Sequence, residues 1–236
     1  MNSPTRYQSN LGRFVTLSHT GPMLAKMAPL VIFAVFALAG CGHKASANLA
    51  PSETETSADL PAGWKLLKAK NDPISIGLPP AWISVDMSVD SFNKSLNANT
   101  SSRLSNQRGV AKDAAANNQY KLIFRSTVLA DGRHATGVIM QVHLKSETNL
   151  HKQSLANADY LRKTGVKVDV SASDLPAGPS ELLRYDALSQ DTLLTHLSYC
   201  LMQKGDFYIV GFSFPLGDVN DEQLANQMAK TFRIGG

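Results

Sequence analysis

Apolar and polar residues alternate along several stretches in the second half of the chain, which is the pattern of strands that bury one face. Three of these stretches follow one another near the C-terminus. The predicted strands are Glu181–Leu188, Thr192–Met202 and Asp206–Phe214, with turns at Gln190-Asp191 and Lys204-Gly205. The last strand, DFYIVGFSF, is apolar on both faces. We therefore expect it at the centre of a sheet whose two faces are both covered.

A further hairpin is predicted upstream, where Tyr120–Leu129 and Thr136–Lys145 flank the turn dipeptide Asp131-Gly132. Strict alternation would place Tyr120, Leu122, Phe124, Ser126 and Val128 on one face of the first strand. Shorter strands are predicted at 64–69, 74–78, 83–85 and 166–170.

Helical spacing of apolar residues predicts two long helices. The first covers 150–164, with Gly165 as its C-terminal stop. The second runs from Asp221 to Phe232, with Asn220 or Asp218 as N-cap and a stripe at Leu224, Met228 and Phe232. Residues 89–97 have a short helical pattern, and 97–118 fit either a helix or an exposed loop. Together these elements predict an α+β domain, an antiparallel sheet packed with helices.

The N-terminal part of the chain contains an uncharged apolar run, residues 27–40, preceded by Lys26. It is shorter than the roughly 20 apolar residues that a transmembrane helix needs, and fits the apolar region of a signal peptide. It ends in Leu38-Ala39-Gly40-Cys41. This tetrad resembles a lipobox, the site that lipoprotein signal peptidase recognises. The resemblance implies that Leu38, Ala39 and Gly40 are recognised, and that Cys41 becomes the lipid-bearing first residue.

Several acyl chains on Cys41 would anchor the protein permanently, because each buried methylene contributes about 0.8 kcal/mol. Gly42, in place of an aspartate, resembles the sorting signal for the outer membrane, with the domain facing the periplasm, although the inner membrane remains open. The start at Met1 or Met23 is also open.

Composition then divides the chain into three parts: a signal peptide (1–40), a lipidated flexible tether (41–62) and one globular domain (63–236). The tether is rich in Ala, Ser, Thr, Glu and Pro and lacks aromatic residues, so it cannot bury enough apolar surface to fold. About 20 flexible residues give a reach of about 25 Å. A domain of this size can bury one hydrophobic core.

The formal charge of +4 is misleading, because residues 1–40 contain Arg6, Arg13 and Lys26 and no acid. The rest of the chain has 20 Lys and Arg residues against 19 Asp and Glu residues. A nearly neutral domain without a basic stripe argues against a nucleic-acid partner.

No catalytic constellation, cofactor motif or metal-ligand spacing is evident in the sequence. Cys200 and His196 should share a strand face but lie about 13 Å apart, too far to share a metal or a proton. His143 would have to supply the base if Cys200 were a nucleophile. A buried Cys200 that acts as a small apolar residue is the simpler interpretation.

Two function classes remain open. The first, which we favour, is a non-catalytic binding or assembly module that holds an envelope partner protein or a small ligand and exposes apolar surface. The second is an envelope hydrolase with an unrecognised active site, which would need a pocket that gathers titratable groups.

The order of elements and three local motifs resemble the PsbP family and its Mog1-like and DcrB-related neighbours. The motifs are Pro79-Pro80 with Trp82, then Phe212-Ser213-Phe214-Pro215, then Thr231-Phe232-Arg233-Ile234. The resemblance covers about residues 64–234 and implies an α/β/α sandwich in which Trp82 and Phe232 belong to the core. No metal-binding His, Asp or Glu set can be carried over to matching positions of this sequence, so we expect no metal or cofactor. The photosystem binding of the photosynthetic members is not carried over either.

Overall fold

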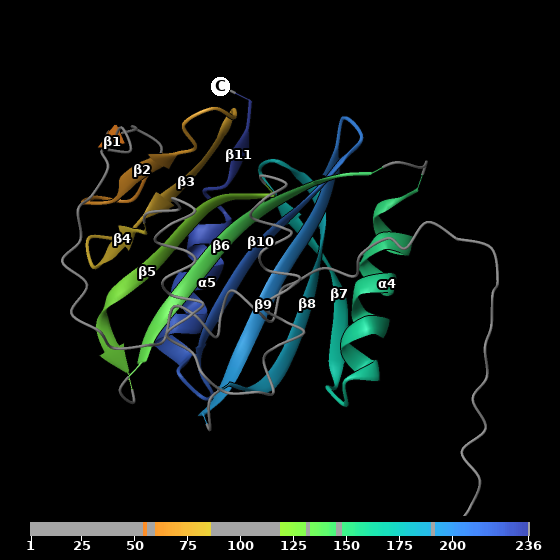
Figure 1. Cartoon of the computed structure of the whole chain (residues 1–236). Coiled ribbons are helices and arrows are strands. Elements are labelled where there is room, and N and C mark those ends of the chain that lie inside the picture. The colour runs from red at the N-terminus through yellow and green to blue at the C-terminus, as the bar shows by residue number, and fades with distance from the viewer. Residues whose placement is uncertain are drawn as a thin grey trace, which may run out of the picture.

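The computed structural model describes residues 54–55, 60–85, 119–130, 133–144, 148–189 and 192–235. Their largest element is a seven-stranded sheet (Figure 1). Its strands in chain order are β4 (Trp82–Ser84), β5 (Tyr120–Ala130), β6 (Arg133–His143), β7 (Val168–Leu175), β8 (Gly178–Ser189), β9 (Thr192–Gln203) and β10 (Asp206–Pro215). The spatial order is β4-β5-β6-β10-β9-β8-β7, and every neighbouring pair is antiparallel.

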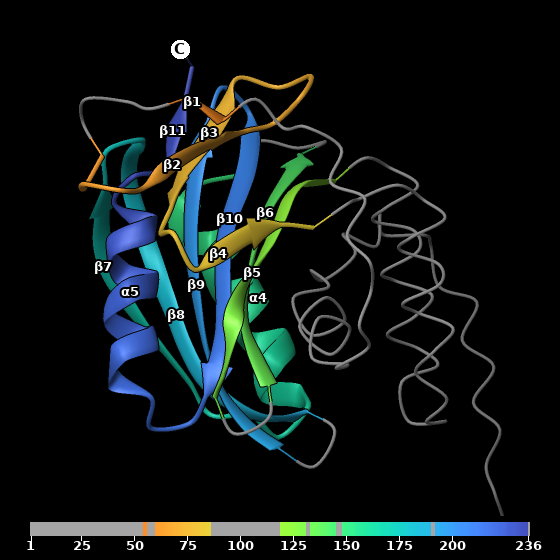
Figure 2. The same cartoon turned by 90° about the vertical axis from the view of Figure 1, so that its left-hand side faces the viewer.

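A smaller antiparallel sheet closes one end of the molecule. Its strands are β1 (Thr54–Glu55), β2 (Lys65–Lys68), β3 (Ile74–Leu78) and β11 (Arg233–Ile234), in the order β1-β2-β3-β11. Strand β11 brings the C-terminus to this end, at the top of Figure 2. Strand β1 pairs with β2 although it lies in the stretch whose composition predicts a tether. The domain boundaries themselves stay a prediction.

The two helices, α4 (Leu150–Lys163) and α5 (Val219–Ala229), cover opposite faces of the large sheet (Figure 2). Helix α4 buries Ala158 and Leu161 against the face that includes Leu183 and Ile209. Helix α5 packs Met228 and its neighbours against the other face, where the small sheet also contributes. The α+β class and the sandwich arrangement predicted from the sequence are thus confirmed.

Local sequence explains the ends of both helices. The side chain of Asn149 accepts a hydrogen bond from the Lys152 backbone N–H at 2.8 Å, which caps α4, and Gly165 follows its last turn with φ +89°. Of the two predicted N-caps for α5, Asp218 is the one that accepts from the Asp221 backbone N–H, at 3.0 Å. Helix α5 ends at Ala229, so the predicted helix end at Phe232 is wrong.

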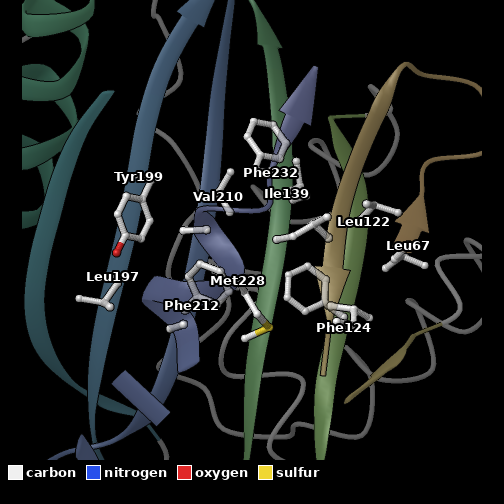
Figure 3. Packing of buried hydrophobic residues seen from close by; sticks show 14 of the residues in the cluster. Leu67, Leu122, Phe124, Ile139, Leu197, Tyr199, Val210, Phe212, Met228 and Phe232 are labelled. Atoms are coloured by element: carbon white, nitrogen blue, oxygen red, sulfur yellow. The ribbon is translucent and has the colours of Figure 1, made fainter. Parts of the chain in front are cut away.

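Strand β10 is the fourth of the seven strands, which confirms its predicted central position. Its side chains alternate between two cores, with Ile209 facing α4 and Val210 facing α5. The core beneath α5 is rich in aromatic side chains, and Phe124, Phe212 and Phe232 lie in it together (Figure 3). Trp82 and Phe232 are both buried, as the sequence predicted.

The single-face assignment for the first long strand is wrong. Tyr120 belongs to the core beneath α4, whereas Leu122 and Phe124 belong to the core on the other face. The register of β5 against β6 shifts between Tyr120 and Leu122. An irregularity of this kind adds a residue to one strand and reverses the direction of the side chains beyond it.

Candidate functional site

The lipobox residues Leu38, Ala39, Gly40 and Cys41 lie outside the residues that the structure describes. Lipidation of Cys41 therefore stays a prediction. Among the described residues, no helix is long and apolar enough to cross a membrane.

Cys200 and His196 both lie on the α4 face of β9, as alternation predicts, and both are buried. Burial raises the pKa of the Cys200 thiol to about 12, so thiolate is nearly absent at neutral pH. Burial also lowers the pKa of His196 to about 3, so its imidazole is neutral. A neutral thiol without access to solvent is an inert core group, as the simpler interpretation of Cys200 holds.

His143 cannot supply a base to Cys200, because the two side chains lie on opposite faces of the sheet. The side chain of His143 is 82% exposed, and its Nδ1 lies 2.9 Å from Asp206 Oδ1. A second exposed pair joins His151 Nδ1 to Glu181 Oε1 at 2.8 Å. Each pair is one imidazole with one carboxylate, and the described part of the chain holds no group of three potential metal ligands.

A hollow of about 410 Å³ lies at the loop between β10 and α5, lined by residues 215–220. Asp218 is its one titratable side chain, and it is already engaged as the N-cap of α5. Hydrolysis needs a nucleophile or activated water within reach of a base. This hollow does not gather such groups, but it does present apolar side chains to solvent.

Leu216 and Val219 line this hollow, and two further exposed leucines lie at the end of the adjoining β8–β9 ladder, on the α5 side of the sheet. We call these four apolar residues the apolar end patch. They are exposed to between 42% and 66% of their surface: Leu188, Leu193, Leu216 and Val219. Soluble domains seldom gather large apolar side chains in one exposed place unless that place contacts another molecule.

The backbone holds the patch in a fixed arrangement. Leu188 and Leu193 are directly opposite each other at the end of the β8–β9 ladder. The backbone N–H of Leu216 donates to the carbonyl of Leu193 at 3.1 Å, which ties the loop after β10 to the same ladder. Val219 then begins α5. The four side chains therefore come from two hairpin strands, one loop and one helix start.

Carboxylates flank the patch on the same side of the sheet. They are Asp186 on β8, Asp218 at the N-cap, and Asp221 and Glu222 in the first turn of α5. Arg184 on β8 is bonded to Glu222, with its Nε and Nη2 each 3.3 Å from a carboxylate oxygen. Asp186 Oδ1 accepts a hydrogen bond from the Thr195 hydroxyl at 2.8 Å. Burial, followed by the charge of Asp218, raises the pKa of Asp221.

The elements that carry the patch and the small sheet lie at opposite ends of the large sheet (Figure 1). The β8–β9 hairpin and the start of α5 are at the bottom, whereas β2, β3 and the C-terminus are at the top (Figure 2). Sequence reasoning missed the patch, because Leu188 and Leu193 look like ordinary inward-facing strand residues. The available signal was the pair of leucines, each separated by one residue from the predicted Gln190-Asp191 turn.

No family model matches the chain, and no curated protein matches it. Solved structures do match. One is the solution structure of cyanobacterial PsbP from Synechocystis, which is 12% identical, with a TM-score of 0.48 over 76% of this chain and 97% of that one.

A second is LpqN of Mycobacterium tuberculosis, described as involved in cell envelope biogenesis, which is 17% identical, with a TM-score of 0.46 over 71% of this chain and 88% of that one. A third is the Ran-binding protein Mog1p of Saccharomyces cerevisiae, which is 11% identical, with a TM-score of 0.44 over 72% and 95%. The resemblance to PsbP-like and Mog1-like structures predicted from the sequence is confirmed by these matches.

Proposed function

We propose that the protein is a lipoprotein of the bacterial cell envelope, held in the outer membrane by acyl chains on Cys41. Its globular domain is a non-catalytic module that holds an envelope partner protein with the apolar end patch. The domain stands in the periplasm at the end of a flexible tether.

The observation that carries this proposal is the apolar end patch itself. Fully burying a Leu or Val side chain contributes about 1.5–3 kcal/mol. Leu188, Leu193 and Val219 are exposed in the chain alone, so this free energy is available to a complex. Because the β-ladder and α5 already fix the positions of these residues, little conformational entropy of the backbone would be lost on binding.

The direction of the patch supports the same function. The chain enters the domain near the small sheet, at the end where β2 lies, and the β8–β9 hairpin and the start of α5, which carry the patch, are at the other end (Figure 1). A tether running from Cys41 would therefore attach to the end that is distant from the patch. The lipid anchor would thus not obstruct the patch, which stays accessible to proteins of the periplasmic space.

Lipidation is tested by growing cells with a labelled fatty acid. The wild-type chain should carry the label and Cys41→Ala should not, whereas Cys200→Ala should be labelled like the wild type, because Cys200 is buried in the core. If Cys41→Ala carries the label, or if the wild type carries none, the proposed lipid anchor on Cys41 is wrong.

Partner binding is tested with a photo-crosslinking amino acid at position 219 of the full-length protein in living cells. The matched control is position 152, an exposed site on α4. We expect a defined adduct from position 219 that is absent from position 152 and is lost when Leu188→Ser and Leu193→Ser are added. No adduct at 219, or an adduct indifferent to these substitutions, would contradict the proposal.

A further inference from the structure

The apolar end patch is bordered by negative charge, and this border determines which partner can approach it. Asp218 and Asp221 lie within one turn of Val219, at the start of α5. Asp186 follows Arg184 on the same face of β8, two residues before Leu188. Arg184 is bonded to Glu222, and its charge also acts on Asp186, which accepts a hydrogen bond from Thr195. Within the described part of the chain, no salt bridge joins Asp218 or Asp221 to a cation.

The two carboxylates at the helix start also repel each other. Asp218 is held in place because its side chain accepts from the Asp221 backbone N–H at 3.0 Å. Partial burial and the charge of Asp218 together raise the pKa of Asp221. A cation placed between the two side chains would relieve this repulsion, whereas an anion would increase it.

We propose that the apolar end patch binds a cationic amphipathic polypeptide segment, whose apolar side chains cover Leu188, Leu193 and Val219 and whose Lys or Arg side chains pair with Asp218 and Asp221. This inference rests on the proposed function and names the chemistry of its partner. Arginine and lysine at the border of an apolar contact provide selectivity and faster association.

The same charges argue against two other occupants. A second copy of the chain, packed patch to patch about a two-fold axis, would bring Asp218 and Asp221 toward their own counterparts. Like charges at such an interface cost free energy. An anionic bilayer surface attracts basic segments, and it would repel the carboxylates beside the patch.

The inference is tested with the full-length protein in a neutral detergent and three dye-labelled synthetic peptides of about 14 residues. One has leucines at helical spacing with lysine at the remaining positions, the second has glutamate in place of lysine, and the third has serine in place of leucine. Fluorescence anisotropy measures binding, with peptide and detergent alone as the blank. We expect the lysine–leucine peptide to bind at least about tenfold more tightly than either of the others.

The decisive variant is Asp218→Asn combined with Asp221→Asn. Asparagine caps a helix as well as aspartate does, so α5 should remain intact while two charges are lost. The control is Asp159→Asn with Asp174→Asn, which removes the same charge from exposed positions on α4 and β7. We expect binding of the lysine–leucine peptide to weaken about five- to tenfold in the first variant and to be unchanged in the control.

Equal binding of the glutamate peptide, or equal weakening in both variants, overturns the inference. A dimer seen in sedimentation that Leu193→Ser dissociates also overturns it, by making a second copy the occupant. If the peptides fail while the cellular adduct at position 219 persists, the inference alone falls. Loss of that adduct removes the proposed function itself.

Discussion

Tyr185 and His196 stack on each other across strands β8 and β9, with their ring centroids 4.8 Å apart and their planes inclined by 14°. They are direct cross-strand partners on the α4 face of the sheet, and both are buried. Removal from water penalises the charged form of each group. Burial therefore raises the pKa of the Tyr185 phenol and lowers the pKa of His196 to about 3.

The buried imidazole makes stability depend on pH. An unfolded histidine takes up a proton below about pH 6.5, whereas His196 in the folded chain has a pKa of about 3. Between these values the unfolded state binds more protons, so the free energy of unfolding decreases as the pH falls. The contribution is fully present above pH 6.5 and changes by at most about 1.4 kcal/mol per pH unit.

The substitution His196→Phe keeps an aromatic ring beside Tyr185 and removes the titrating group. Urea unfolding at pH 7, 6, 5 and 4 should show a smaller loss of stability in this variant than in the wild type. His143→Gln is the control, because His143 is exposed at the opposite face. An unchanged pH dependence in His196→Phe would mean that the folded protein protonates His196 readily.

Cys200 should be unreactive in the folded protein. Its thiol is buried and its pKa is raised to about 12, first by burial. In a Cys41→Ser background, where Cys200 is the one thiol left in the chain, a chromogenic disulfide reagent should label the native protein only at the rate of unfolding. In concentrated urea, labelling should be fast and stoichiometric. Fast labelling of the native protein would show that Cys200 is accessible.

Local pattern was sufficient for most strands and for both helices of the described fold. The central place of β10 followed from Ile209 and Val210, which carry apolar side chains to both faces. The β9–β10 turn was predictable because glycine readily adopts the positive φ angles of tight hairpin turns. In the structure, Lys204 and Gly205 have φ angles of 52° and 85°. Such features depend on a few neighbouring residues, so the sequence alone contains them.

Two features could not be predicted from local pattern because they depend on tertiary structure: the face of the sheet on which Tyr120 lies, and the exposure of the apolar end patch. The register shift in β5 interrupts an alternation that otherwise looks regular. Leu188 and Leu193 have the correct parity to be buried beneath α5, but they remain exposed at the end of the sheet. Alternation predicts which face of the sheet a side chain is on. It does not predict how far along that face the helix packed on it extends.

Thr231 joins the small sheet to the end of α5 through one buried hydroxyl. Its Oγ1 accepts a hydrogen bond from the Gly77 backbone N–H at 2.7 Å and donates to the Met228 carbonyl at 2.6 Å. The nearly isosteric Thr231→Val leaves the buried Gly77 N–H without this acceptor. We expect a loss of about 1–3 kcal/mol in the free energy of unfolding.

The control for this prediction is Thr127→Val, since the exposed Thr127 hydroxyl also donates to a backbone carbonyl, that of Ala81, at 2.9 Å. Water can replace that bond, so the cost should be below about 1 kcal/mol. Chemical denaturation of both variants measures the difference. Equal stability losses would show that the hydrogen bonds of the buried Thr231 hydroxyl contribute no more to stability than that of the exposed Thr127 hydroxyl.

Gly137 on β6 leaves room for the ring of Phe124, its direct partner on β5. A Cβ at position 137 would overlap that ring. The ring cannot easily move away, because it also packs against Trp82 and Phe212, with centroids 5.9 and 6.1 Å distant. Gly137→Ala should therefore destabilise the fold by about 1–3 kcal/mol through overpacking.

A double-mutant cycle with Phe124→Leu isolates this contact. The smaller leucine removes the overlap, so the double variant should lose less stability than the sum of the two single variants, by about 0.5–3 kcal/mol. Urea unfolding of the four proteins measures the coupling. Additive losses would mean that Gly137→Ala destabilises the protein through the backbone of β6, and not through overlap with the Phe124 ring.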